Sequence, residues 1–269
     1  MTNSNTFDRR AIGAGLVAAG AFALARPAQA AEQSAADKAK AFAALPDWTG
    51  IWMGVGTTLF EQKAGAQSLN ANNPNARDFP PYKPDWERAY QTFLNDVVKQ
   101  EKFSDPLSLG YPGGMMRMMS PARGLQFVLR PEQVWIIYER PDVRYIYTDG
   151  RPFPPKDELW PTFEGYSIGH WEGDTLVVQT VSIRGGIPID RTGAALSDEA
   201  RVTERIRKTD AKSLQSDITI EDPVAFTGPW KVTRRYVKRP EQYPRMENVS
   251  TRTKKTRMMT CISVEWRYS

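Results

Sequence analysis

The sequence has almost no cysteine or histidine, and this scarcity excludes several kinds of chemistry. Among 269 residues there is one cysteine, Cys261, and one histidine, His170. A single cysteine cannot form a disulfide within the chain. A Cys/His zinc site needs three or four such ligands, which the sequence cannot supply. We therefore expect no metal site of this type, and we expect Cys261 to be buried and inert within its apolar run, residues 258–264.

The sequence also lacks the motifs of common cofactor sites and the dense charge of a nucleic-acid binder. It contains no EF-hand loop, no glycine-rich phosphate loop and no serine elbow. The formal net charge is only +5. The one basic cluster, residues 252–257, is typical of a solvated turn between strands. We expect no cofactor and no nucleic-acid partner.

Long hydrophobic runs are absent as well, and the one mildly apolar segment lies at the N-terminus. Arg9 and Arg10 precede an uncharged run over residues 11–25, and the small residues 28–30 follow Arg26. This order is typical of a secretion signal. The run is shorter than the roughly 20 residues of a membrane span, so we expect no stable membrane insertion. The paired arginines and Arg26 favour the twin-arginine route to the periplasm.

The same segment sets the expected domain boundaries. Residues 1–30 are the expected signal peptide, 31–45 a lead-in segment, and 46–269 a single domain. Loss of the signal would lower the net charge from +5 to +3. A general secretory signal is the alternative, because Asp8 stands where the twin-arginine consensus usually has Ser or Thr.

Downstream of residue 124 the sequence predicts an antiparallel β-barrel. Short apolar runs, rich in β-branched and aromatic residues, alternate with turn residues such as Pro, Gly and Asp. Together with a strand near Trp48, about nine strands are expected, and closure would remove exposed sheet edges. The predicted strands are Leu125–Leu129, Val134–Tyr138, Val143–Tyr147, Thr175–Val181, Ala200–Ile206, Leu214–Ile220, Trp230–Val237 and Met258–Trp266.

One helix is predicted before the barrel strands. Pro84 and Asp85 are typical helix-start residues, and apolar side chains recur at helical spacing from Trp86 to about Phe103. The other face of this helix mixes acidic and basic residues. We therefore expect the N-terminal helix to be docked on the barrel rather than bound to a membrane.

The sequence resembles a large family of exported bacterial proteins. The motif runs from Ile146 to Pro152, with Asp-Gly-Arg-Pro at its end, and continues from Ser167 to Val178, with Gly-His-Trp-Glu-Gly-Asp-Thr-Leu-Val-Val. The resemblance implies a lipocalin-like (calycin-type) barrel, as does the Gly-x-Trp at Gly50 and Trp52. It also implies a cofactor-independent lyase of aromatic or lignin-derived compound catabolism.

Four residues are candidates for catalysis. Histidine is the side-chain type that titrates near neutral pH, so His170 is the first candidate acid or base. Strand alternation would place Tyr166 on the same face as His170. Arg151 could orient an acidic or phenolic substrate, or form a structural turn with Asp149. Glu204 alternates with apolar neighbours, so an inward Glu204 would need a partner or a raised pKa.

A second set of residues is expected to line a ligand pocket. Methionine adapts to irregular apolar shapes, so the four methionines over residues 115–119 could form a flexible pocket wall or simply a plug at one barrel end. The loop over residues 185–191 could cap the barrel mouth. The expected substrate-binding residues are Met115, Met118, Tyr147, Trp171, Asp190 and Arg191.

These features support three functions. The first is a periplasmic enzyme of lyase or isomerase type, which transfers protons on a hydrophobic, aromatic or lignin-derived small molecule. The second is a periplasmic protein that binds such a molecule without chemistry. The third is a protein-binding envelope component with a filled barrel and an exposed apolar patch. The position of His170 separates the first from the second, because catalysis by His170 requires it to face the cavity.

Overall fold

The computed structural model describes residues 35–56, 80–100, 110–120, 124–140, 142–190 and 193–239. The expected export signal, Arg191, Cys261, the basic cluster at 252–257 and the predicted strand Met258–Trp266 lie outside the described residues.

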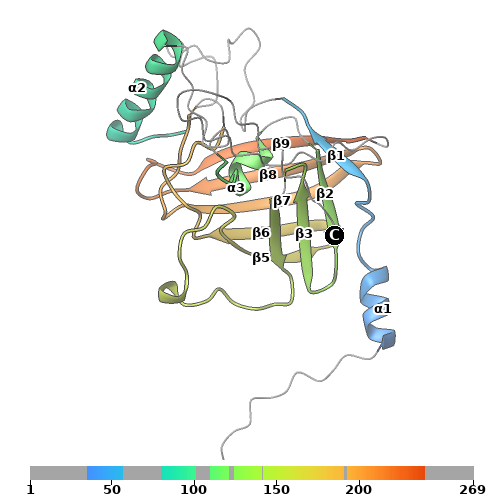
Figure 1. The fold of residues 1–269 in the computed structure, drawn as a ribbon. Helices are drawn as coiled ribbons and strands as arrows, with labels where there is room; N and C mark the ends of the chain where they lie inside the picture. The colour runs from blue at the N-terminus through green and yellow to red at the C-terminus, as the bar shows by residue number, and fades with distance from the viewer. Residues whose placement is uncertain are drawn as a thin grey trace, which may run out of the picture.

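The described part of the chain forms a closed barrel of nine strands (Figure 1). Neighbouring strands are antiparallel except β4 and β5, which are parallel, and β1 closes the barrel against β9. The strands are β1 Ile51–Gly54, β2 Gly124–Leu129, β3 Gln133–Tyr138, β4 Val143–Tyr147, β5 Tyr166–Glu172, β6 Thr175–Val181, β7 Arg201–Asp210, β8 Ser213–Glu221 and β9 Trp230–Arg239.

The alternation of side chains along these strands builds the core. In β3 the buried positions are Val134, Ile136 and Tyr138, and in β8 every second residue from Leu214 to Ile220 is buried. Successive side chains of a strand point to opposite faces, so the buried set faces the barrel interior. Seven of the predicted strands are confirmed to within a few residues. The predicted all-β fold is therefore confirmed as a nine-stranded closed barrel, although the ninth strand is β5.

The parallel pairing of β4 and β5 interrupts the expected meander. Parallel neighbours need a crossover connection, and residues 148–165 supply it; we call this segment the strap. It carries a short 3₁₀ turn, η3, at Lys156–Glu158, and it returns to the barrel at Gly165. Gly165 has φ +65°, and a Cβ there would lie 2.7 Å from Thr180 Cγ2 and 2.8 Å from the Val181 carbonyl oxygen. Only glycine allows so close an approach to β6.

One end of the barrel is filled by tryptophans. Trp52 and Trp48 are 0% and 1% exposed, and the Trp52 indole donates a hydrogen bond to the Trp48 carbonyl at 2.9 Å. The Trp48 ring makes edge contacts with Phe127 at 5.0 Å and with Trp171 at 5.3 Å. Trp171 is near the C-terminal end of β5, so this aromatic group lies at the opposite end of β5 from the strap.

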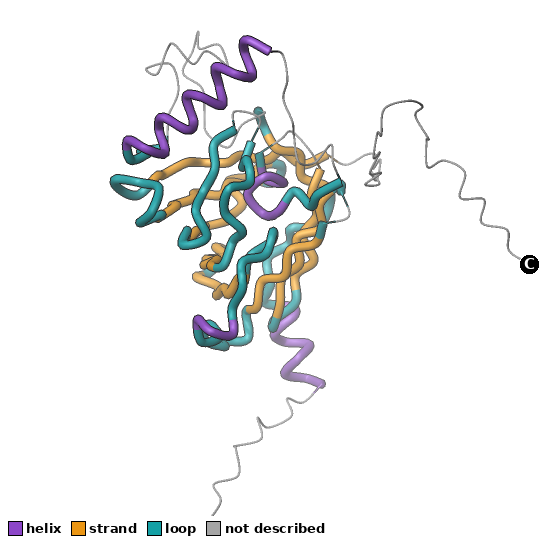
Figure 2. Tube along the Cα trace, turned by 60° about the vertical axis from the view of Figure 1, so that its left-hand side comes forward, coloured by secondary structure: helices purple, strands orange, loops and turns teal. Residues whose placement is uncertain are grey.

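The other end is filled by α3, Gly114–Met119, whose six residues are all buried. Figure 2 shows this short helix among the loops at one end of the strands. The Met115 amide donates to the Phe163 carbonyl at 3.1 Å, just before β5. Arg234 of β9 holds the helix C-terminus by donating to the carbonyls of Met119 at 2.8 Å and Ser120 at 2.6 Å. The methionines therefore form a plug that backbone contacts hold in place.

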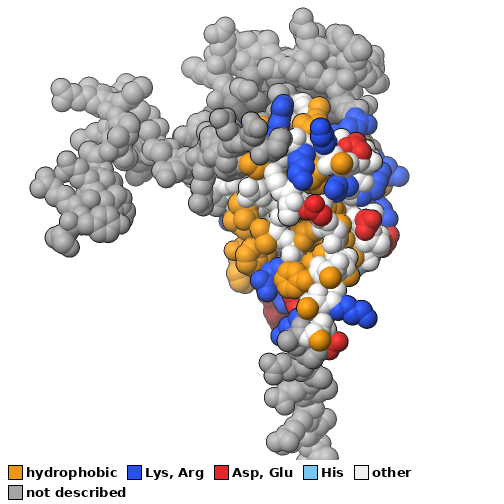
Figure 3. Space-filling model, turned by 90° about the vertical axis from the view of Figure 1, so that its right-hand side faces the viewer, with side chains coloured by type: hydrophobic (Ala, Val, Ile, Leu, Met, Phe, Trp, Pro, Cys, Tyr) orange, Lys and Arg blue, Asp and Glu red, His pale blue; other side chains and the backbone are white. Residues whose placement is uncertain are grey.

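Two further helices lie before the main run of strands: α1, Ala35–Ala43, and α2, Pro84–Gln100. The predicted helix start at Pro84 is confirmed. The first turns of α2 contact Tyr82, whose ring lies 6.1 Å from Trp86 and 5.5 Å from Tyr90. No helix in the described ranges combines the length and apolarity needed to cross a membrane. On the face shown in Figure 3, basic side chains are interspersed with hydrophobic and acidic ones.

We expect Trp52→Ala to lower the free energy of unfolding by about 3–5 kcal/mol, because it removes a large side chain from a filled barrel end. Urea denaturation followed by circular dichroism measures the change. Trp160→Ala is the matched control: Trp160 is 73% exposed, and its loss should change stability by less than about 0.5 kcal/mol. Equal losses in the two variants would contradict the structural role of Trp52.

Candidate functional site

His170 lies on the outer surface of the barrel. Its side chain is 64% exposed, and its Nε2 lies 3.1 Å from Glu172 Oε1. Glu172 also accepts a hydrogen bond from Arg205 at 2.7 Å on the neighbouring outer face. Arg205, and to a smaller extent His170, lower the pKa of the Glu172 carboxyl. The structure thus places His170 in a surface ion-pair group and away from the barrel interior.

The register of β5 explains this position. Ser167 is 1% exposed and faces the interior. Tyr166 and His170 lie an odd number of residues from Ser167, so they point outward. Tyr166 and His170 do share a face, as the alternation suggested, but it is the outer one.

Tyr166, Arg151 and Tyr147 come together on that outer face. The Arg151 guanidinium carbon lies 3.9 Å from the centroid of the Tyr147 ring, and the Tyr147 and Tyr166 rings are 5.3 Å apart. Arg151 Nη2 donates to Asp149 Oδ2 at 2.6 Å, and Arg151 Nε lies 2.9 and 3.0 Å from the two oxygens of the same carboxylate. The structural Asp–Arg turn that the sequence allowed is the arrangement present.

Glu204 is the one candidate catalytic residue inside the barrel. It is fully buried on β7, and it forms an ion pair with Arg144 of β4, which is also fully buried. Because Glu139 and Arg144 flank the turn between β3 and β4, the sequence predicts a cross-strand ion pair between them. This prediction is wrong, since Arg144 pairs with Glu204. Arg144 and Ile146 share the inward face of β4, and the inward direction brings Arg144 to Glu204.

Two hydroxyl groups complete the Arg144 environment. Arg144 Nε donates to Ser167 Oγ at 3.2 Å, and Arg144 Nη2 donates to Thr180 Oγ1 at 2.8 Å. The two hydroxyl oxygens are 2.9 Å apart. Burial alone would lower the pKa of Arg144, but the Glu204 carboxylate reverses this and the pKa is raised. The guanidinium therefore stays charged in the interior.

Several buried atoms around this pair have no hydrogen-bond partner in the described part of the chain. They are Arg144 Nη1, Glu204 Oε1, the Tyr138 hydroxyl and both carboxylate oxygens of Glu164. An unsatisfied buried polar group costs about 1–3 kcal/mol, and buried polar groups normally bond to protein, ordered water or a ligand. We call Arg144, Glu204, Tyr138 and Glu164 the interior polar cluster.

Glu164 has a carboxyl group suited to proton transfer near neutral pH. Burial, together with repulsion from Asp142, raises its pKa to about 8, although Arg144 acts in the opposite direction. Tyr138 interacts with Arg144, Glu164 and Glu204, and burial raises the pKa of its hydroxyl well above the ordinary value. An acid with a pKa near the working pH is the efficient choice for general acid–base catalysis.

The expected pocket residues are divided between distant parts of the molecule. Met115 and Met118 lie in the α3 plug, Tyr147 lies on the outer face, and Trp171 packs at the opposite barrel end. Asp190 is fully buried and interacts electrostatically with Arg234, which also contacts α3. The methionines and Asp190 thus belong to one end of the barrel, and Trp171 belongs to the other.

Sequence reasoning overlooked Arg144 and Glu164. A signal for Arg144 exists, because it stands two residues from Ile146 in a short strand and so shares its face. No comparable signal exists for Glu164, which lies in the strap one residue before Gly165. Its burial depends on α3 and the strap meeting at Phe163.

Comparison with known proteins adds no assignment: no protein-family model and no curated protein matches the chain.

We expect Arg144→Met to lower the free energy of unfolding by about 3–5 kcal/mol, because it leaves the Glu204 carboxylate buried without its counter-ion. The double variant Arg144→Met/Glu204→Met should recover much of this loss. The matched control is Arg205→Met, which breaks the exposed pair with Glu172 and should cost less than about 1 kcal/mol. Equal losses in Arg144→Met and Arg205→Met, measured by urea denaturation, would contradict the role of the buried pair.

We expect Glu164 to make the folded state less stable as pH rises. Its pKa is about 8 in the folded state against 4.5 for an ordinary Glu, so between these values the folded state holds a proton that the unfolded state has lost. The contribution of Glu164 is fully favourable below pH 4.5 and is lost as pH rises through 8. The slope is at most about 1.4 kcal/mol per pH unit. Glu164→Gln should flatten the pH dependence of unfolding between these values, while the surface variant Glu132→Gln should leave it unchanged.

Proposed function

We propose that the interior polar cluster is the site of a periplasmic, cofactor-independent enzyme of lyase or isomerase type. Its substrate is a hydrophobic small molecule, aromatic or lignin-derived, with one polar group. The observation that carries the proposal is the set of buried, unpartnered polar atoms around Arg144 and Glu204. A substrate hydroxyl or carbonyl would satisfy these atoms, and the apolar core around them would accommodate its hydrocarbon part.

The cluster offers a division of roles for proton-transfer chemistry. Glu164, with its raised pKa, can give or accept a proton near neutral pH. Arg144 would stabilise negative charge that develops on the substrate oxygen, and Glu204 would hold the guanidinium in position. The Tyr138 hydroxyl can donate a further hydrogen bond. These roles replace His170, whose exposed position leaves it without access to the interior.

The α3 plug supports access to this site. Methionine side chains are flexible and adapt to ligands of irregular shape, and Met115 and Met118 belong to the plug. Asp190 lies at the same end, beside Arg234. We propose that a ligand enters past α3, with these residues as its contacts. The proposal includes the lipocalin-like relationship, the docking of α2 on the barrel and export by the twin-arginine route, all of which rest on the sequence.

A specific observation favours a second function, binding without chemistry. His170, the only histidine, lies outside the barrel, and Arg144 and Glu204 already neutralise each other. A carrier for the same hydrophobic molecule would need a binding site but no residue that transfers protons.

Proton exchange between ligand and solvent tests the proposal without knowledge of the product. The mature protein is incubated in D₂O with a panel of aromatic ketones, aldehydes and β-hydroxy ethers, and deuterium uptake and new products are followed by ¹H NMR. We expect turnover in at least one compound class, and a loss of about 100-fold in kcat for Glu164→Gln with a smaller change in KM. The control Glu132→Gln should match the wild type.

The outcomes separate the two functions. Tight binding without exchange or turnover would establish the carrier and overturn the enzyme. Absence of both binding and turnover across the panel would overturn both. Turnover that Glu164→Gln leaves unchanged would remove Glu164 from the mechanism.

A further inference from the structure

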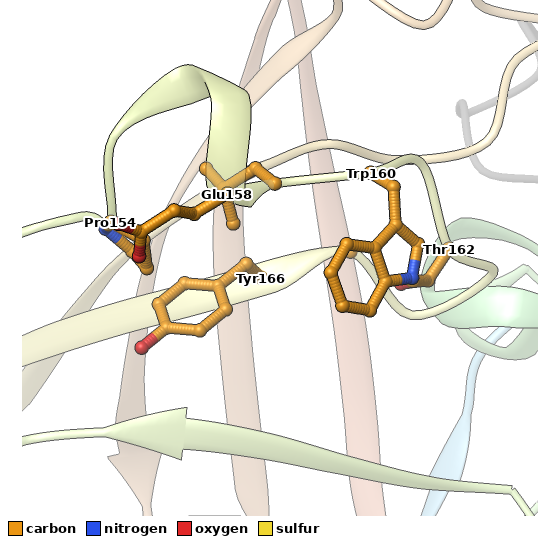
Figure 4. A pocket seen from close by; sticks show the side chains of 7 residues that line it. Pro154, Glu158, Trp160, Thr162 and Tyr166 are labelled. Atoms are coloured by element: carbon orange, nitrogen blue, oxygen red, sulfur yellow. The ribbon is translucent and has the colours of Figure 1, made fainter.

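A cleft lies outside the barrel, between the strap and the outer face of β5; we call it the strap cleft. It has a volume of about 300 Å³, and its lining includes Pro154, Glu158, Leu159, Trp160, Thr162 and Tyr166. Figure 4 shows Pro154 and Glu158 above the Tyr166 ring, with the Trp160 indole on the opposite side of the view. Tyr166 points outward from β5 while its neighbour Ser167 points inward, so the barrel wall separates this cleft from the buried pair of Arg144 and Glu204.

One aromatic wall of the cleft, Trp160, is open to solvent, and the other, Tyr166, is partly buried. Trp160 is 73% exposed, the highest fraction among the large hydrophobic side chains on the described surface. The Tyr166 ring is partly buried between Tyr147 at 5.3 Å and Phe153 at 6.1 Å. The exposed indole and the partly buried Tyr166 ring offer aromatic surface to a ligand at little cost in side-chain entropy.

The strap holds these rings in a fixed position. The Thr162 amide donates to the Ser182 carbonyl at 2.9 Å, and the Arg184 amide donates to the Thr162 carbonyl at 2.8 Å. Near the middle of the strap, Lys156 Nζ lies 3.0 Å from both carboxylate oxygens of Glu199. The strap also contains several prolines, which restrict its backbone. A cleft fixed in this way loses little freedom when a ligand binds.

The charges around the cleft leave one carboxylate without a counter-ion. Glu158 is exposed in the lining and forms no ion pair with a described residue. Two cations of the strap are already paired, Arg151 with Asp149 and Lys156 with Glu199, and the Arg184 guanidinium lies over the Phe163 ring. The cleft therefore combines two aromatic rings with an unpaired negative charge.

We propose that the strap cleft binds a small organic cation with an apolar shell, such as a quaternary ammonium group. Such cations bind to the faces of Trp and Tyr rings through the ring quadrupole, and a nearby carboxylate strengthens the attraction. A trimethylammonium group has the size for a 300 Å³ cleft and presents methyl groups to its apolar lining. This binding site is independent of the proposed enzyme or carrier function in the barrel.

Calorimetric titration with choline chloride tests the proposal, and 3,3-dimethylbutan-1-ol serves as the neutral ligand of the same shape. We expect choline to bind with a Kd of about 1 mM or below, and the alcohol to bind at least about tenfold more weakly. Trp160→Ala should weaken choline binding at least about tenfold. Glu158→Gln should weaken it several-fold and reduce its dependence on salt.

Matched variants distinguish the cleft from the rest of the molecule. Tyr145→Ala removes another exposed ring, 51% exposed on β4, and Glu132→Gln removes another surface carboxylate. Both should bind choline as the wild type does. Circular dichroism checks that each variant is folded.

Three results would overturn the proposal. The first is the absence of choline binding up to roughly 50 mM. The second is equal affinity for choline and its neutral counterpart, which would show an apolar cleft without cation selectivity. The third is unchanged choline affinity in both folded variants, Trp160→Ala and Glu158→Gln. Failure of the interior enzyme leaves all three measurements unaffected, so the two proposals fail separately.

Discussion

The buried ion pair of Arg144 and Glu204 is the constraint around which the barrel interior is organised. Removing two charges from water costs several kcal/mol for each ion, and their mutual attraction offsets this only with further hydrogen bonds. Ser167 and Thr180 supply those bonds to the Arg144 guanidinium. Strands β4, β5, β6 and β7 must therefore keep one relative register, because each contributes a group to the same network. The pair thus links strands that lie far apart in the sequence.

The ends of the barrel isolate this network from solvent in two different ways. At one end Trp48 and Trp52 fill the space with rigid rings. At the other end the filling comes from α3, whose side chains are flexible methionines and whose position depends on hydrogen bonds to the backbone, including those from Arg234. Rigid rings make a permanent floor, while a short helix of methionines is suited to movement around a ligand. Glu164 belongs to the methionine end, because its neighbour Phe163 accepts a hydrogen bond from α3.

The sequence predicted the barrel well because the strands obey local rules. Alternating burial in runs such as Val134–Tyr138 can be recognised without knowledge of any partner strand. Strand β5 was not among the predicted strands, because it contains Gly169 and His170 and has few apolar residues. The sequence also left open which face of β5 points into the barrel. Alternation shows that Tyr166 and His170 share a face, but a shift of one residue exchanges the inner and outer faces. The same sequence pattern was therefore compatible with His170 inside or outside.

By itself the sequence determined most of the strands, although not β5. It also determined the start of the helix at Pro84 and the fact that Glu204 alternates with apolar neighbours on β7. Only the tertiary structure decided that Glu204 faces Arg144, that His170 lies at the surface, and that Glu164 is buried near Asp142. The reason is physical. Periodicity depends on neighbours two to four residues apart, whereas the environment of a charged group depends on segments brought together by barrel closure. Arg144 and Glu204 are 60 residues apart in the chain, and their ion pair forms because the closed barrel turns both side chains toward the same interior.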